Sequence, residues 1–108
     1  MKIWMNFMSY DKVMTEIFVD YKTKEVKIHN HTDFFLDRAF GVNEHPTFED
    51  YKELLRDRCF PETRQLLKLH LKELGVPYYE PLLIIEKTKG RIAGDPYWID
   101  IKREELDD

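Results

Sequence analysis

A hinge that contains proline, between two stretches with helical periodicity, constrains this chain more than any other feature. Residues 58–64 read Arg-Cys-Phe-Pro-Glu-Thr-Arg. Proline has no amide proton and disfavours a helical conformation in the preceding residue, so a helix ends ahead of Pro61 and another can begin there. Apolar residues recur at helical spacing on both sides of the hinge, as Phe48, Tyr51, Leu54, Leu55 and Cys59 before it and as Leu67, Leu71 and Leu74 after it.

Capping residues bound a helical region over residues 47–90. Thr47 and Asp50 have the spacing of a capping box, which indicates a first helix that begins at residue 47. A second helix runs from the hinge to Gly75, which suits its C-terminal cap. Pro81 begins a third helix, and Gly90 ends it. We therefore predict three helices between residues 47 and 90.

The rest of the chain favours strands. Residues 1–29 alternate with the two-residue period of a strand and predict a three-stranded antiparallel meander, a sheet so small that it needs a covering layer. A last strand is expected over residues 96–102, followed by a charged tail at residues 103–108. We predict a single α+β domain over residues 1–108, with the three helices packed on the meander and one C-terminal strand.

Residues 30–46 show no period, yet they are too apolar for a free loop. We expect this irregular segment to pack on the sheet through its apolar side chains, which are Phe34, Phe35, Leu36, Ala39, Phe40 and Val42.

Composition excludes several classes of protein. The net charge of -4 argues against a non-specific DNA or RNA binder, which normally shows a basic excess. Cys59 is the only cysteine, so an intrachain disulfide is excluded. The first residues are too mixed for a signal peptide, and no apolar run approaches the length of a membrane span. These features predict a soluble cytoplasmic protein.

The candidate reactive residues do not form a recognisable active site. His29 and His31 would share one face of a strand, but a zinc site needs three or four convergent ligands and the other candidates are scattered. Cys59 lies on the inner face of the predicted first helix, where a free cysteine packs as a small apolar residue. No phosphate-binding, hydrolase or kinase motif is present. We predict no enzymatic activity, no metal and no cofactor.

The most informative polar residues are basic. Arg64, Lys68 and Lys72 are spaced four residues apart, so they would line one ridge of the second helix. Such a ridge is commonly the solvated face of an amphipathic helix, and it can also be the electrostatic footprint of an acidic protein or a nucleic-acid backbone. A helix-turn-helix is disfavoured because the join carries proline in place of a short turn with glycine.

A second cluster of polar residues surrounds the hinge. Arg58, Arg64, Arg91 and Asp95 are the residues that we expect at its centre. The two hinge arginines can bind a partner, or they can hold the hinge by bonding to carbonyl groups at helix ends and by pairing with Asp95, since the guanidinium fork suits both roles. Trp98 would anchor an interface if it is exposed.

These motifs resemble a small bacterial module. The pattern Arg58-x-x-Pro61-x-x-Arg64 between two helices, followed by Gly90-Arg91 and by Asp95-x-Tyr97-Trp98, is similar to the N-terminal region of HipA-like serine/threonine kinases. It also resembles uncharacterised stand-alone proteins of toxin–antitoxin-like or mobile-element gene clusters. The chain has no kinase segment, so the resemblance implies a module whose partner is encoded separately.

The resemblance leads to one functional hypothesis and three alternatives. We expect a non-enzymatic module that binds a partner protein encoded nearby and tunes its activity. The first alternative is a DNA-binding regulator that uses the basic ridge of the second helix, for which affinity would fall steeply with salt. The second is a phage-type inhibitor that blocks a nucleic-acid channel. A thiol or metal enzyme is the third.

Overall fold

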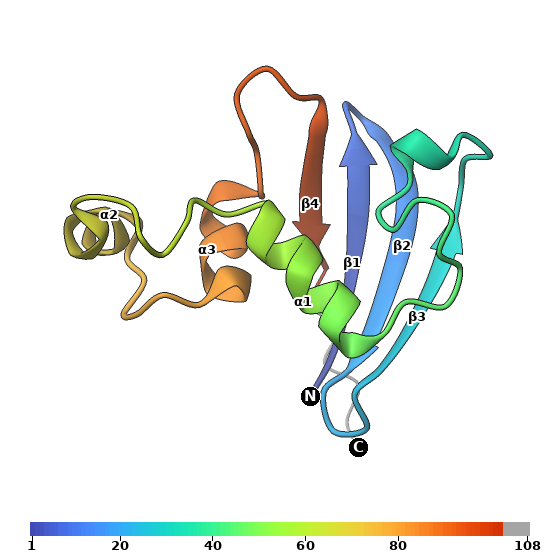
Figure 1. Cartoon of the computed structure of the whole chain (residues 1–108), viewed down its shortest axis with the longest axis horizontal. Coiled ribbons are helices and arrows are strands. Elements are labelled where there is room, and N and C mark those ends of the chain that lie inside the picture. The colour runs from blue at the N-terminus through green and yellow to red at the C-terminus, as the bar shows by residue number, and fades with distance from the viewer. Residues whose placement is uncertain (103–108) are drawn as a thin grey trace.

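A four-stranded antiparallel sheet forms one side of the molecule. The structure, a computed structural model, describes residues 1–102, so the predicted charged tail lies outside the described residues. The strands are β1 (Lys2–Ser9), β2 (Lys12–Asp20), β3 (Glu25–Asn30) and β4 (Tyr97–Ile101), in the order β3-β2-β1-β4 (Figure 1). The predicted meander of β1, β2 and β3 is confirmed, and the C-terminal strand joins it beside β1.

Alternation of side chains gives the sheet one apolar face. Met5, Ile17 and Ile99 point to the same side and are fully buried, as the two-residue period of a strand requires. On this face pack two helices, α1 (Phe48–Asp57) and α3 (Pro81–Thr88). The core is therefore a layer between the sheet and this helix pair.

The predicted helix ends are confirmed where local chemistry determines them. The hydroxyl of Thr47 accepts a hydrogen bond from the Asp50 amide at 3.1 Å, and the Asp50 carboxylate accepts one from the Thr47 amide at 2.9 Å. These two bonds complete the capping box of α1. Gly75 ends α2 (Leu67–Leu74) with a φ of 76°, a left-handed conformation that glycine adopts without steric cost.

The predicted start of the second helix is wrong. Residues 61–66 form turns, in which the Arg64 amide donates to the Pro61 carbonyl at 3.0 Å. Leu66 then takes a left-handed conformation with a φ of 60°, and the helix begins only at Leu67. Arg64 therefore lies outside α2, so the predicted ridge of three basic residues on one helix is wrong for Arg64.

The prediction that all three helices pack on the sheet is also wrong for α2. This helix lies at the end of the molecule away from the sheet and packs against α3 (Figure 1). Leu71, Val76 and Ile84 form a separate small cluster there. The chain of residues 58–66 thus carries α2 away from the main core and creates space between α2, α3 and the hinge.

The irregular segment at residues 30–46 packs on the sheet only in part. Ala39 and Phe40 contact the main core as expected. The aromatic and aliphatic side chains around the 3-10 helix η1 (Phe35–Asp37) are exposed, contrary to the prediction, and these are Phe34, Phe35, Leu36 and Val42. Hydrogen bonds hold the segment instead, such as that from the Ala39 amide to the Thr15 hydroxyl at 3.1 Å.

None of the helices among residues 1–102 has the length and apolar character needed to cross a membrane.

Candidate functional site

Arg58 is a buried clamp between the hinge and the segment that leads into β4. It is the C-cap residue that directly follows α1, and its side chain is 9% exposed. Its Nε donates to the Gly90 carbonyl at 2.9 Å, and Nη1 and Nη2 donate to the two carboxylate oxygens of Asp95 at 3.0 and 3.2 Å. Nη2 also donates to the Tyr97 carbonyl at 2.9 Å. The sequence left two roles open for Arg58, binding a partner or holding the hinge, and these four bonds hold the hinge.

Asp95 is held by groups other than Arg58 as well. Its Oδ1 accepts a hydrogen bond from the Tyr97 amide at 2.6 Å. The hydrogen bond from Arg58 is the main cause that holds the pKa of Asp95 below its usual value, and the Tyr97 amide lowers this pKa further. The carboxylate therefore stays ionised and fixes the start of β4.

The clamp also depends on the close approach of Gly90. A Cβ atom at this position would lie 3.3 Å from the Cβ of Arg58. Gly90 has a φ of 63°, which side chains rarely adopt. Gly90 thus lets the end of α3 approach the hinge closely enough for its carbonyl to accept from Arg58 Nε.

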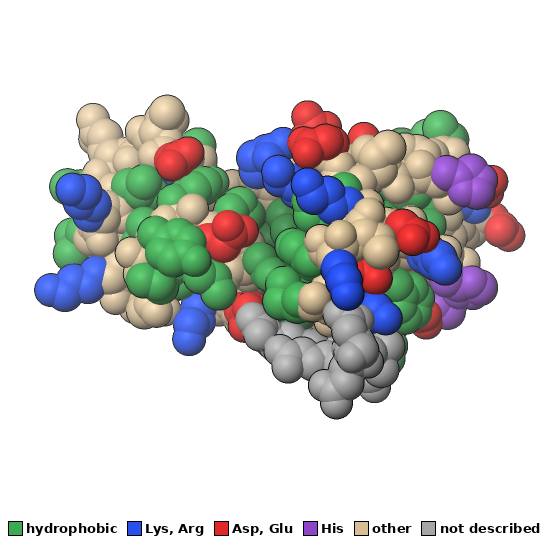
Figure 2. All heavy atoms as spheres, turned by 90° about the horizontal axis from the view of Figure 1, so that it is seen from below, with side chains coloured by type: hydrophobic (Ala, Val, Ile, Leu, Met, Phe, Trp, Pro, Cys, Tyr) green, Lys and Arg blue, Asp and Glu red, His purple; other side chains and the backbone are tan. Residues whose placement is uncertain are grey.

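A groove of about 410 Å³ opens between the hinge, α2 and α3. Its apolar surface comes from Phe60, Leu74, Ile84 and Ile92. Seen from below, the α2–α3 end of the molecule shows hydrophobic side chains at the surface, with both basic and acidic side chains among them (Figure 2). The groove exists because α2 packs on α3 rather than on the sheet.

Basic side chains line this groove. Arg64 and Arg91 contribute exposed guanidinium groups, and His70 contributes an imidazole. Within residues 1–102, no carboxylate oxygen lies within 4.0 Å of the side-chain nitrogens of Arg64 or Arg91. No Asp or Glu among the described residues lines the groove, so its charge is positive.

Aromatic rings support both exposed arginines. The guanidinium carbon of Arg64 lies 5.3 Å from the centre of the Phe60 ring, and that of Arg91 lies 4.6 Å from the centre of the Trp98 ring. Trp98 is fixed in turn by a hydrogen bond from its indole nitrogen to the Tyr10 carbonyl at 2.6 Å. Cation–π contacts of this kind hold the two positive charges in place before any partner binds.

We call Arg64, His70, Arg91 and the four apolar residues Phe60, Leu74, Ile84 and Ile92 the basic groove. The polar residues that the sequence places around the hinge thus lie close together. Arg58 and Asp95 fix the segment that carries Arg91, and the Trp98 ring packs against the Arg91 guanidinium group. Lys68 and Lys72 do not line the groove and lie exposed on α2.

Sequence reasoning missed the apolar side of the groove and His70. The position of His70 four residues before Leu74 was the only signal for it, since these residues share one face of a helix. Ile84 and Ile92 enter from α3 and the following turn, and no local pattern relates them to the hinge.

Cys59 also lines the groove but is unsuited to nucleophilic catalysis. Burial is the main cause that raises the pKa of its thiol to about 12, and the Glu80 carboxylate raises it further. The Cys59 Sγ donates to the Pro81 carbonyl at 3.6 Å. A reactive cysteine needs the opposite environment, one that stabilises the thiolate.

We expect Cys59 to react slowly with a disulfide reagent such as dithiobis(nitrobenzoate) at pH 8. Raising the pKa from 9.0 to about 12 lowers the thiolate fraction at pH 8 about a thousandfold, and the greater nucleophilicity of a more basic thiolate offsets part of this loss. The native protein should therefore react on the order of a hundredfold more slowly than the urea-unfolded chain. Absorbance at matched pH and reagent concentration measures both rates. Equal rates would contradict this environment for Cys59.

The histidine pair offers no metal centre in the described part of the chain. The rings of His29 and His31 are 4.7 Å apart, and His31 Nε2 lies 2.9 Å from a carboxylate oxygen of Glu16. Residues 1–102 contain no group of three or more His, Cys, Asp or Glu side chains placed to hold a metal ion.

Comparison with known protein families, with curated proteins and with solved structures finds no match. The HipA-like resemblance therefore stays a prediction that depends on the motifs at residues 36–64 and 90–99.

Proposed function

We propose that this chain is a non-enzymatic cytoplasmic module that binds a separately encoded protein and modulates its activity, in a toxin–antitoxin-like or mobile-element setting. The observation that carries the proposal is the basic groove, in which two exposed arginines lie beside apolar side chains. Arginine binds carboxylates through two parallel hydrogen bonds, and Arg and Trp are enriched at interface hot spots. The groove is therefore suited to an acidic segment of a partner protein.

The apolar surface of the groove favours a protein partner over a nucleic acid. A phosphate backbone is neutralised by many basic side chains, whereas this groove offers two exposed arginines and a histidine around Phe60 and Ile84. The overall charge of -4 also opposes non-specific binding of DNA or RNA. Carboxylate side chains next to an aliphatic or aromatic side chain match both parts of the groove.

The genetic setting in this proposal comes from the HipA-like resemblance alone. The rigid clamp at Arg58 supports a docking role, because it fixes the position of Arg91 relative to Arg64 without a partner. A preformed site loses less conformational entropy on binding than a mobile one.

Co-expression tests the proposal. The tagged chain is expressed with each product of the neighbouring genes in turn, and purified complexes are identified by mass. We expect one product to co-purify at a fixed ratio and to change activity in the complex. The proposal fails if the chain stays without a partner beside all of them, or if it instead shifts DNA in a strongly salt-dependent manner.

A further inference from the structure

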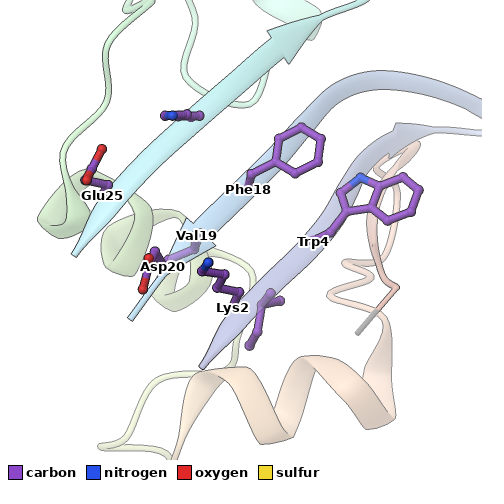
Figure 3. Close-up of a pocket in the computed structure, with 8 residues that line it drawn as sticks. Lys2, Trp4, Phe18, Val19, Asp20 and Glu25 are labelled. Carbon is purple, nitrogen blue, oxygen red and sulfur yellow. The ribbon is translucent and has the colours of Figure 1, made fainter. Parts of the chain in front are cut away.

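The face of the sheet opposite α1 and α3 carries an aromatic pair, in which Phe18 is exposed and Trp4 is half-buried. Trp4 and Phe18 lie on the adjacent strands β1 and β2, with their ring centres 6.0 Å apart and their planes nearly parallel. Phe18 is 41% exposed. Figure 3 shows the two rings next to each other, with Lys2, Asp20 and Glu25 further along the strands. A hollow of about 250 Å³ lies among these side chains and Lys27.

The same face leaves polar atoms without partners. Asn6, next to Trp4 on this side of β1, is only 6% exposed, and its Oδ1 accepts no hydrogen bond from the described residues. The indole nitrogen of Trp4 is buried and likewise lacks an acceptor there. Buried polar groups in folded proteins are nearly always hydrogen-bonded, and leaving them unpaired is costly. Both atoms are buried within the chain itself, so the part of this face that another molecule can cover is the exposed Phe18 ring with the neighbouring Trp4 ring.

The charges on this face indicate which molecule. Glu25 and Lys27 are both exposed on β3, they line the hollow, and within residues 1–102 neither takes part in an ion pair. Their opposite signs do not suit a partner that carries charge of one sign. Glu16 and Asp100 flank Asn6 on the neighbouring strands, and each carboxylate already contacts a basic side chain, His31 at 2.9 Å and Lys102 at 2.7 Å. This part of the face therefore offers a partner no excess of one charge.

A second copy of the chain satisfies both signs at once. In a two-fold symmetric interface each residue meets its counterpart's neighbours, so every contact occurs twice. Lys27 of one copy can then meet Glu25 of the other, and the reverse, along the β3 edge beside the paired aromatic rings. We propose that the chain forms a two-fold symmetric dimer through this sheet face, with the Trp4–Phe18 pair at the centre and reciprocal Lys27–Glu25 ion pairs at its border.

Sedimentation equilibrium tests the dimer over a concentration series from about 1 to about 300 μM. The mass of the wild-type chain should rise from 13.2 kDa toward twice that value. Phe18→Glu should weaken association at least about a hundredfold, because it places a charge in a desolvated centre. Val42→Glu changes another exposed apolar residue outside this face and should leave association unchanged.

Charge exchange tests the symmetry and does not depend on Phe18. Glu25→Lys and Lys27→Glu should each weaken association, since each places like charges opposite one another, by about fivefold or more. The double exchange should restore it, because every ion pair then re-forms in the reverse sense. A wild-type chain that stays at 13.2 kDa, a dimer that survives Phe18→Glu, or a double exchange no better than the single ones would each overturn the proposal. Arg64 and Arg91 do not line this hollow, so the dimer and the partner-binding groove fail or succeed independently.

Discussion

Replacement of Arg58 by alanine is expected to lower the free energy of unfolding by about 3 kcal/mol. The substitution removes four hydrogen bonds, so the carbonyls of Gly90 and Tyr97 lose the Arg58 donor and the Asp95 carboxylate keeps only the bond from the Tyr97 amide. Loss of one partner from a buried ion pair commonly costs about 3–5 kcal/mol, and the 28% exposure of the Asp95 side chain favours the lower end. Urea denaturation followed by circular dichroism measures the difference.

Two further variants distinguish the loss of the Arg58 hydrogen bonds from the loss of a positive charge alone. Arg58→Lys keeps the charge but loses the planar fork, so it should recover only part of the stability. Arg56→Ala removes an exposed arginine from the same helix and should change the free energy of unfolding by less than about 0.5 kcal/mol. If Arg58→Ala also falls within about 0.5 kcal/mol of the wild type, the clamp does not hold the hinge.

Acid should reduce the difference between the wild type and Arg58→Ala. The pKa of Asp95 is lowered in the folded state, so the ion pair contributes fully above the ordinary carboxyl pKa of 3.8. This contribution is lost as the pH falls through the lowered pKa, where Asp95 becomes protonated. The hydrogen bonds to the Gly90 and Tyr97 carbonyls do not depend on this protonation.

Local signals in the sequence predicted much of the fold. The capping box at Thr47 and Asp50, the glycine at residue 75 and the proline at residue 81 act within one helical turn, so their consequences can be read without the tertiary structure. The alternation of the strands predicted the meander for the same reason. Sequence also allowed the pairing of Arg58 with Asp95 as one of two roles.

Tertiary packing determined what the sequence did not reveal. Helical spacing of Arg64 and Lys68 suggested a continuous helix, but the left-handed Leu66 turns the chain so that α2 can reach α3. Phe34 and Leu36 looked like buried residues because apolar composition does not show whether hydrogen bonds already anchor a segment. The groove could not be predicted because Ile84 and Ile92 are far from the hinge in sequence and meet it only through tertiary packing.

Reversal of charge in the basic groove is expected to weaken partner binding at least about a hundredfold. In Arg64→Glu/Arg91→Glu, each site that would bind a carboxylate carries one instead, and loss of a desolvated charged contact commonly costs about 2–5 kcal/mol. The guanidinium groups make no ion pair within residues 1–102, so the substitutions cost the fold only two cation–π contacts. Urea denaturation of this variant checks that it remains folded.

Lys68→Glu/Lys72→Glu is the matched control. It changes the net charge by the same amount on an exposed part of α2 that does not line the groove. A general electrostatic attraction would respond to both double variants alike and would be screened by salt. Specific binding in the groove would respond to the first variant far more than to the second.

Titration calorimetry of the co-purified partner with the wild-type chain and both double variants tests the groove most directly. The account predicts a dissociation constant that rises at least about a hundredfold for Arg64→Glu/Arg91→Glu and by less than about threefold for Lys68→Glu/Lys72→Glu. Equal losses for the two variants, or full affinity with both groove arginines reversed, would contradict it.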